Sequence, residues 1–173
     1  MILNKKNIEK KCCFYTSDFH LEMIIVPYIN KKIEENKNII IVTENKLEET
    51  VKLLISRMHI KNTKELCKLD WNNNDIKQIK GKNDLVIIIN GTREFINNKN
   101  NEINNLLGTK EFEIINCFCF DEIKEEIVEI SNEHTRVLNN LQKNYWKIIL
   151  NVISCIKALK RKEEFYGANF RWN

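Results

Sequence analysis

Up to residue 132, short apolar runs with β-strand character alternate with segments of helical periodicity. Strands are predicted at residues 12–16, 38–43, 66–71, 85–89 and 112–120. Consecutive apolar β-branched residues at 39–42 make the second strand too apolar for a solvated face, which predicts a central position in the sheet. The alternation is typical of βαβ units. It predicts an α/β fold of three layers, with a mostly parallel sheet between flanking helices.

Capping residues mark where the intervening helices begin. Helices are expected to start at Ser17, Asn45, Thr92 and Asp121. Such side chains accept a hydrogen bond from a free N–H of the first helical turn, and Glu48 completes a capping box with Asn45. Pro27 lies inside the first helical pattern and predicts a kink or a break, whereas Gly108 predicts the end of the third helix. The polar stretch 72–83 is expected to be a surface connection with a short helix.

The pattern changes at residue 133 to one long helix with little interruption up to Gly167. Its apolar residues recur at spacings that alternate between three and four, the heptad pattern of a coiled coil. This seam consists of Leu138, Leu141, Tyr145, Ile148, Val152, Cys155 and Leu159. We therefore expect residues 1–132 to form one domain and residues 133–173 to form a dimerisation helix with a basic, aromatic tail. The alternatives are a helix packed on its own domain and a four-helix bundle, since further isoleucines widen the apolar stripe.

Length and composition fit one globular domain with an appendage. The chain has 173 residues, of which 43% are hydrophobic and 30% are charged. No apolar run approaches the ~20 residues of a membrane span, and no signal peptide follows the lysine-rich N-terminus. We therefore expect a cytoplasmic protein without membrane contact. In that compartment the six cysteines are expected to be reduced packing residues.

The turn after the first strand lacks the residues of a phosphate site. Residues 15–20 contain neither the glycine nor the lysine that a phosphate-binding loop needs. Cys12, Cys13, Cys117 and Cys119 could meet if the first and last core strands pair, but adjacent strand residues face opposite sides and suit a tetrahedral zinc site poorly. The sequence therefore predicts no metal, no cofactor and no nucleotide hydrolysis. A cysteine nucleophile is the enzymatic alternative, although no local motif pairs a cysteine with a histidine.

Polar residues gather where the predicted strands end. They are Tyr15, Ser17, His20, Thr43, Glu44, Asn90, Thr92, Arg93 and Glu94. Because ligands of parallel sheets bind beyond the carboxyl ends of the strands, these residues form a candidate small-molecule site. The same residues also suit an ordinary solvated rim of helix caps. The many asparagines of the chain reflect A+T-rich coding, so individual surface asparagines carry little weight.

Several segments resemble the MEDS domain, a sensory domain named after methanogen, methylotroph and dichloromethane-regulator proteins. They are residues 13–21 (CFYTSDFHL), 26–29 (VPYI) and 39–45 (IIIVTEN), and the strand at 117–120 followed by Asp121 resembles a later strand of that family. The resemblance implies a RecA/KaiC-like fold that has lost its phosphate loop. It also implies a sensory role beside a DNA-binding or histidine-kinase module.

Residues 144–153 are similar to the dimerisation and phosphoacceptor helix of histidine kinases. The positions that match its pattern are Lys147, Leu150, Asn151 and Ile153. Asn144 stands at the phosphoacceptor position, where an amide cannot replace the imidazole. The resemblance implies a non-enzymatic regulatory protein that forms a homodimer and modulates a signalling partner such as a histidine kinase.

The C-terminal end offers an alternative function. The net charge of +4 is concentrated there, because the residues from 143 onward hold seven Lys or Arg against two Glu. The candidate nucleic-acid contacts are Lys157, Lys160, Arg161, Lys162 and Arg171. Basic residues interleaved with aromatic ones suit phosphate contact and base stacking, so a nucleic-acid-binding transcriptional regulator is the alternative. Lys and Arg are also common near helix C-termini.

Val152→Glu tests the predicted seam. A carboxylate at the centre of a symmetric helix interface would be buried twice without a partner, which costs several kcal/mol. We expect the wild-type chain to be a dimer and the Val152→Glu variant to be a folded monomer by light scattering. A wild-type monomer that unfolds on substitution would show instead that the helix packs on its own domain.

Overall fold

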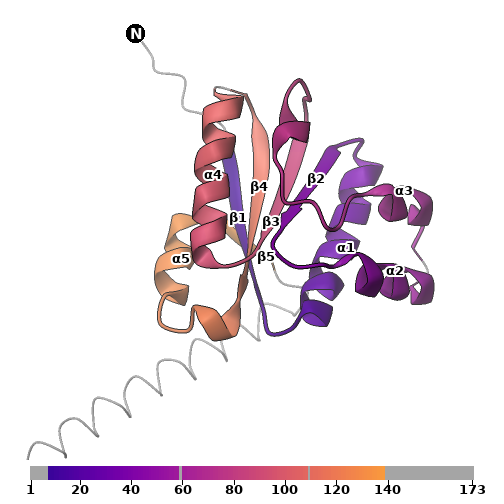
Figure 1. The fold of residues 1–173 in the computed structure, drawn as a ribbon, viewed down its shortest axis with the longest axis horizontal. Coiled ribbons are helices and arrows are strands. Elements are labelled where there is room, and N and C mark those ends of the chain that lie inside the picture. The colour runs from indigo at the N-terminus through magenta and orange to yellow at the C-terminus, as the bar shows by residue number, and fades with distance from the viewer. Residues whose placement is uncertain (1–7, 59, 109, 139–173) are drawn as a thin grey trace, which may run out of the picture. The chain divides into compact units, whose positions relative to one another are not determined.

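The computed structural model describes residues 8–58, 60–108 and 110–138, and these residues form an α/β structure around one five-stranded, all-parallel sheet (Figure 1). The strands are β1 (Ile8–Tyr15), β2 (Asn38–Thr43), β3 (Leu85–Asn90), β4 (Phe112–Cys119) and β5 (Arg136–Leu138). Their spatial order is β2-β3-β4-β1-β5. The predicted α/β class and the parallel sheet are confirmed.

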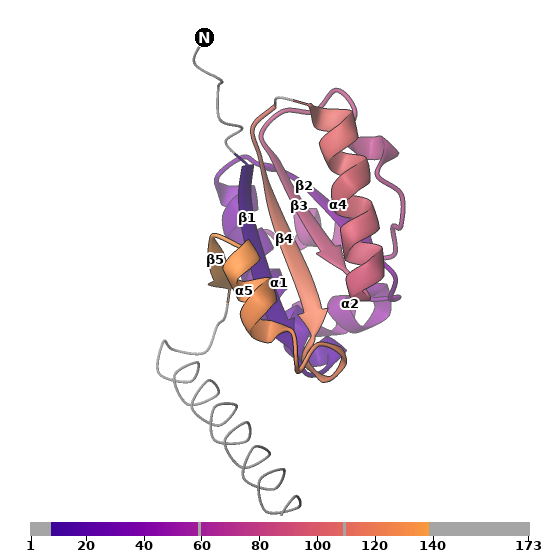
Figure 2. The same ribbon diagram turned by 90° about the vertical axis from the view of Figure 1, so that its left-hand side faces the viewer.

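Helices cover both faces of the sheet (Figures 1 and 2). The α-helices are α1 (Asp18–Glu34), α2 (Glu48–Arg57), α3 (Thr63–Lys68), α4 (Arg93–Leu107) and α5 (Ile127–Glu133), with 3₁₀ helices η1 (Lys77–Ile79) and η2 (Phe120–Glu122). α1, α2 and α3 cover one face, and their apolar residues share one core with the sheet. α4 and α5 cover the opposite face.

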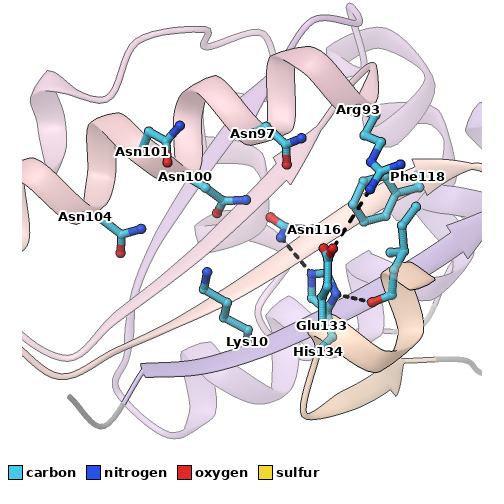
Figure 3. Close-up of a pocket in the computed structure, with 11 residues that line it drawn as sticks. Lys10, Arg93, Asn97, Asn100, Asn101, Asn104, Asn116, Phe118, Glu133 and His134 are labelled. Carbon is cyan, nitrogen blue, oxygen red and sulfur yellow. Dashed lines mark hydrogen bonds and ion pairs between the residues drawn. The ribbon is translucent and has the colours of Figure 1, made fainter. Parts of the chain in front are cut away.

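Successive residues of β1 and β4 point alternately to these two faces. Cys13 and Cys117 lie opposite each other on the paired strands and join the core beneath α1. Lys10, Asn116 and Phe118 point the other way, toward α4 and α5 (Figure 3). Asn116 is a buried polar residue in the middle of β4, where its neighbours from Ile114 to Phe118 are apolar.

The predicted caps of α1 and α4 are confirmed. Ser17 Oγ accepts a hydrogen bond from His20 N (3.2 Å), and Thr92 Oγ1 accepts one from Phe95 N (3.3 Å). Gly108 follows α4 with a φ of 57°, a left-handed conformation that favours glycine and ends the helix.

Pro27 lies inside α1 and does not break it, since α1 is one helix of 17 residues. A proline in a helix interior removes a hydrogen bond and costs ~3 kcal/mol. Ile25, Val26 and Ile29 are buried in the core around it, and burial of such a side chain contributes about 1.5–3 kcal/mol. Tertiary packing therefore outweighs the local cost of the proline.

Residues 66–71, predicted as a strand, belong to α3 and to the turn after it. Leu66 and Trp71 are buried in the same core as α1 and α2. Trp71 Nε1 donates to the Leu66 carbonyl (2.9 Å), which satisfies both buried groups. The apolar residues that suggested a strand are in fact the buried side of a short helix and its exit turn.

β2 lies at an edge of the sheet, so its predicted central position is wrong. The loop ahead of η1 covers this edge. Thr43 N donates to the Asn73 carbonyl (2.7 Å), and Asn73 Nδ2 donates to the Ile41 carbonyl (3.0 Å). A covered edge strand keeps its backbone groups paired, which explains why β2 is as apolar as an interior strand.

Two predicted helix starts are wrong. α2 begins at Glu48, and the residue before it, Leu47, offers no side-chain cap. Asn45 lies in the preceding turn, where its N–H donates to Thr43 Oγ1 (2.9 Å), so no capping box forms. After β4 the chain makes the 3₁₀ helix η2 first, and α5 begins at Ile127.

The long helix predicted from residue 133 does not extend over residues 134–138. α5 ends at Glu133, and β5 pairs in parallel with β1, with Leu138 opposite Cys13. Leu138 therefore belongs to the sheet and not to a helical seam, because β5 covers the edge of β1 that would otherwise be open. The following predicted residues lie outside the described residues: Leu141, Tyr145, Ile148, Val152, Cys155, Leu159, Lys157, Lys160, Arg161, Lys162 and Arg171. Within the described part of the chain, no helix has the length and apolar character needed to cross a membrane.

Candidate functional site

The sheet topology changes direction between the neighbouring strands β1 and β4. These neighbouring strands lead to helices on opposite faces, β1 to α1 and β4 to α5 (Figure 2). Ligands of open parallel sheets bind where neighbouring strands diverge in this way. The polar residues predicted at the strand ends divide into groups.

Thr43, Glu44, Asn90 and Thr92 come together at the ends of β2 and β3. Asn90 Nδ2 donates to Thr43 Oγ1 (3.3 Å). Glu44 N donates to the Asn90 carbonyl (3.0 Å), and Glu44 Oε2 accepts from Thr92 N (2.6 Å). The Glu44 carboxylate thus sits at the start of α4, where the helix dipole favours an anion. These bonds close the turns after β2 and β3 and cap the start of α4.

Ser17 and His20 lie at the start of α1, which approaches the turn after β2, since Asn45 Nδ2 donates to Asp18 Oδ1 (3.4 Å). Ser17 is occupied by its cap, and His20 Nδ1 lies 3.3 Å from Thr16 Oγ1. Glu94 is an exposed residue in the first turn of α4. Within the described residues, no hydrogen bond joins the side chains of Ser17 and His20 to the Glu44 group.

Tyr15 and Arg93 point away from both groups. Tyr15 is buried in the core beneath α1, and this burial raises the pKa of its phenol. Arg93 turns toward α5, where its guanidinium pairs with Glu126, with Glu129 (3.3 Å) and with Glu133 (3.9 Å). Arg93 thereby joins the lining of a cavity that the sequence did not predict.

This space, which we call the amide cavity, has a volume of about 290 Å³ and lies between α4 and α5, over β1 and β4 (Figure 3). Its lining residues are Lys10, Arg93, Asn97, Asn100, Asn101, Asn104, Asn116, Phe118, Ile130, Glu133 and His134. Most ligand pockets are lined mainly by apolar side chains, whereas nine of these eleven residues are polar and five are asparagines. The cavity therefore suits a hydrophilic molecule.

Asn100 occupies a position of α4 where the helical pattern calls for an apolar residue. The buried face of α4 consists of Ile96, Asn100, Ile103 and Leu107. Asn100 is 8% exposed, and Asn104 follows it by one turn, so the two amides lie one above the other. In Figure 3 both side chains project from α4 into the space above Lys10 and Asn116. α4 thus presents a row of amides to the cavity.

Asn116 is held by His134, which follows α5. Asn116 is 2% exposed, and its Nδ2 lies 2.9 Å from His134 Nε2. His134 Nδ1 lies 2.6 Å from the Ile130 carbonyl, which can only accept, so Nδ1 carries the proton. Burial lowers the pKa of His134 and favours the neutral ring. Nε2 is then an acceptor, and Asn116 presents its NH₂ group to it.

Three amide oxygens of the cavity have no hydrogen-bond partner among the described residues, namely Oδ1 of Asn100, Asn104 and Asn116. Only two other buried side-chain atoms in the described part of the chain share this condition. A buried polar group that stays unpaired costs about 1–3 kcal/mol. Because His134 fixes the amide of Asn116, Asn116 Oδ1 is an acceptor that has no donor among the described residues.

Lys10 adds one positive charge to the cavity. Its side chain reaches the cavity from β1 (Figure 3), and no carboxylate of the described residues pairs with its ammonium group. The charge of Arg93, by contrast, is compensated by three glutamates. The cavity thus combines several hydrogen-bond acceptors with one free ammonium donor and a neutral imidazole. This set suits binding of a molecule that carries O–H or N–H groups.

Only some of the cysteines on the paired strands β1 and β4 face the same side of the sheet. Cys13 and Cys117 face the same side, whereas Cys12 points to the opposite face. Burial raises the pKa of Cys12 to about 12, and the neighbouring Cys13 together with burial raises the pKa of Cys117. The thiols of Cys12 and Cys117 therefore stay protonated at neutral pH. Over residues 8–58, 60–108 and 110–138, no three His, Cys, Asp or Glu side chains are grouped to hold a metal ion.

None of the asparagines that line the cavity is among the site residues predicted from the sequence. Their signal is the interruption of apolar patterns, by Asn100 in the buried face of α4 and by Asn116 in the run Ile114-Ile115-Asn116-Cys117-Phe118. A composition rich in asparagine obscures this signal, because most asparagines of α4 lie on its solvated side.

No protein-family model matches the chain, and no curated protein or solved structure matches it at a significant level. The function is therefore inferred from the geometry of the site.

Asn100→Leu is expected to stabilise the protein, because it replaces an unpaired amide with a side chain that completes the buried face of α4. We expect the free energy of unfolding to rise by about 1–2 kcal/mol in urea denaturation. Asn98→Leu, at an exposed position of the same helix, controls for helix propensity and should raise it by at most about 0.5 kcal/mol. A loss of stability in Asn100→Leu would show that the amide has a structural role.

His134 is expected to make stability fall in mild acid. Folding lowers its pKa below the ordinary value of 6.5, so the unfolded chain binds the proton more strongly. The contribution of His134 to stability is constant above pH 6.5. It is lost as the pH falls from 6.5 toward the lower pKa that His134 has in the folded state. His134→Gln should remove this part of the pH profile in urea denaturation, and His20→Gln should keep it. An unchanged profile in His134→Gln would contradict the assignment.

Proposed function

We propose that this chain is a non-enzymatic sensory and regulatory protein whose α/β domain binds a small polar molecule in the amide cavity. Binding alters the C-terminal segment, residues 139–173, and through it a signalling partner such as a histidine kinase. The observation that carries the proposal is the presence of three unpaired amide oxygens around one polar cavity. A bound ligand can give such groups hydrogen bonds that no described residue supplies.

The cavity wall and the C-terminal segment are consecutive in the chain. Ile130, Glu133 and His134 line the cavity, and β5 begins two residues after His134 and ends at Leu138. A ligand that prefers one position of α5 therefore acts directly on the start of the segment that follows. The ligand can shift the equilibrium between two positions of α5 by at most the difference between its binding free energies for them.

α5 is a short and lightly anchored wall, as a responsive element must be. It has seven residues, of which Ile127 and Ile130 are buried. Its link to α4 consists of the ion pairs of Arg93, whose glutamate partners are largely exposed. Exposed ion pairs contribute only about 0–1 kcal/mol each. New hydrogen bonds from a ligand are of comparable strength and can shift α5.

The resemblance to MEDS domains supports the sensory part of the proposal. In that family a RecA/KaiC-related fold has lost its phosphate loop, and the turn after β1 here has neither glycine nor lysine. A five-stranded parallel sheet is compatible with such a fold. The proposal also includes a homodimer, formed through the heptad pattern of residues 141–159, and a cytoplasmic location.

A ligand screen tests the proposal. In differential scanning fluorimetry of the full-length chain, some members of a panel of small polar metabolites should raise the melting temperature of the wild type. Asn116→Leu should abolish the rise because it removes the fixed acceptor, and Asn98→Leu should retain it. Hydrogen exchange should slow in residues 127–138 when a hit is bound. A panel without hits, or hits that stabilise Asn116→Leu as much as the wild type, would contradict the proposal.

A further inference from the structure

We infer that the molecule bound in the amide cavity is uncharged, aliphatic and rich in hydroxyl groups, about the size of a monosaccharide or a cyclitol. This inference rests on the proposed function and names the chemical class of its ligand. Charge, hydrogen-bond direction, lining polarity and volume each restrict the class in a different way.

The charges around the cavity disfavour an anionic ligand. Arg93 is surrounded by Glu126, Glu129 and Glu133, so its charge is already compensated and its neighbourhood is acidic. Lys10 is then the one free cation of the described lining. Phosphate and carboxylate sites in proteins usually supply forked arginine contacts or several backbone N–H groups. An anion here would meet one ammonium group and the carboxylate of Glu133.

Hydrogen-bond direction requires donors on the ligand. The amide of Asn116 cannot turn without placing its oxygen against His134 Nε2, which is an acceptor in the neutral ring. A ligand group that pairs with Asn116 Oδ1 therefore has to be an O–H or N–H donor. Asn100 and Asn104 lie one helical turn apart, and each amide offers a donor and an acceptor. A row of hydroxyl groups matches such a pair, because each hydroxyl both donates and accepts.

The lining offers no surface for stacking an aromatic ligand. Phe118 and Ile130 are the apolar members of the described lining, and Phe118 is 3% exposed. Its ring packs against Phe14 at a centroid distance of 6.1 Å and against His134 at 6.0 Å, so its contacts are already taken. Binding of a nucleobase relies on a free aromatic face. Polar groups on all sides suit instead an aliphatic molecule with hydroxyls around its periphery.

The volume fits a small ring. A cavity of about 290 Å³ lies near the lower end of the range for small-molecule sites, about 300–1,000 Å³. A six-membered sugar or cyclitol ring with its hydroxyl groups fits such a space, and its hydroxyls can take over the hydrogen bonds of the waters that it displaces.

Titration of the full-length, ¹⁵N-labelled chain by NMR tests the class. The neutral probes are D-glucose, D-galactose, D-mannose and myo-inositol, and the competing probes are D-glucose 6-phosphate and adenosine. At least one neutral probe should shift the backbone resonances of residues 97–104 and 127–134. It should bind Asn104→Leu about tenfold more weakly, as expected for the loss of one hydrogen bond. Asn98→Leu should bind it as the wild type does.

The competing probes separate failure of the class from failure of the proposed function. If glucose 6-phosphate or adenosine binds more tightly than every neutral probe, in a way that depends on Asn104, the cavity is a ligand site but the inferred class is wrong. If no neutral probe shifts these resonances, the class is likewise overturned, while hits from the metabolite panel would still support the sensory function. Equal binding to the wild type and Asn104→Leu would place the probe outside the cavity and overturn the inference.

Discussion

The hydrogen bond from Asn116 Nδ2 to His134 Nε2 is the constraint on which the site depends (Figure 3). It joins a buried amide of β4 to the residue that follows α5. The bond requires a neutral imidazole with its proton on Nδ1, which the Ile130 carbonyl and burial together provide. As a result one amide oxygen stays free beneath α4, and the position of α5 is tied to the centre of the sheet. Both consequences follow from one proton position.

The rest of the fold can offset the cost of this site because apolar side chains are buried on both faces of the sheet. α1, α2 and α3 share one continuous core with the sheet, which extends to Trp71. Each large buried side chain contributes about 1.5–3 kcal/mol, so the three amide oxygens without partners in the cavity are tolerated. The face under α4 and α5 buries apolar residues too, among them Ile87, Ile89 and Ile114. The polar cavity and α5 lie beside this apolar packing.

Sequence patterns were sufficient where one local interaction decides the structure, and they failed where contacts distant in the chain decide it. The strands with long apolar runs and the caps Ser17, Thr92 and Gly108 are local features, and they could be predicted. The assignment of Leu66 to a strand failed because its partners in α1 are remote in the sequence. The position of Leu138 could not be predicted because its partner on β1, Cys13, is far away in the sequence. The cavity was missed for the same reason: only the fold shows that Asn100 faces Asn116.

The protonation state of His134 is the most direct test of this account. Long-range ¹H–¹⁵N correlation spectra of the full-length chain at neutral pH distinguish the two neutral tautomers from the imidazolium ion. The hydrogen bond from Asn116 requires a neutral ring that carries its proton on Nδ1, with the Nε2 resonance shifted as that of an acceptor. A proton on Nε2, or a doubly protonated ring at neutral pH, would contradict it. In either case Asn116 would turn its oxygen toward the ring and the cavity would lose its fixed acceptor.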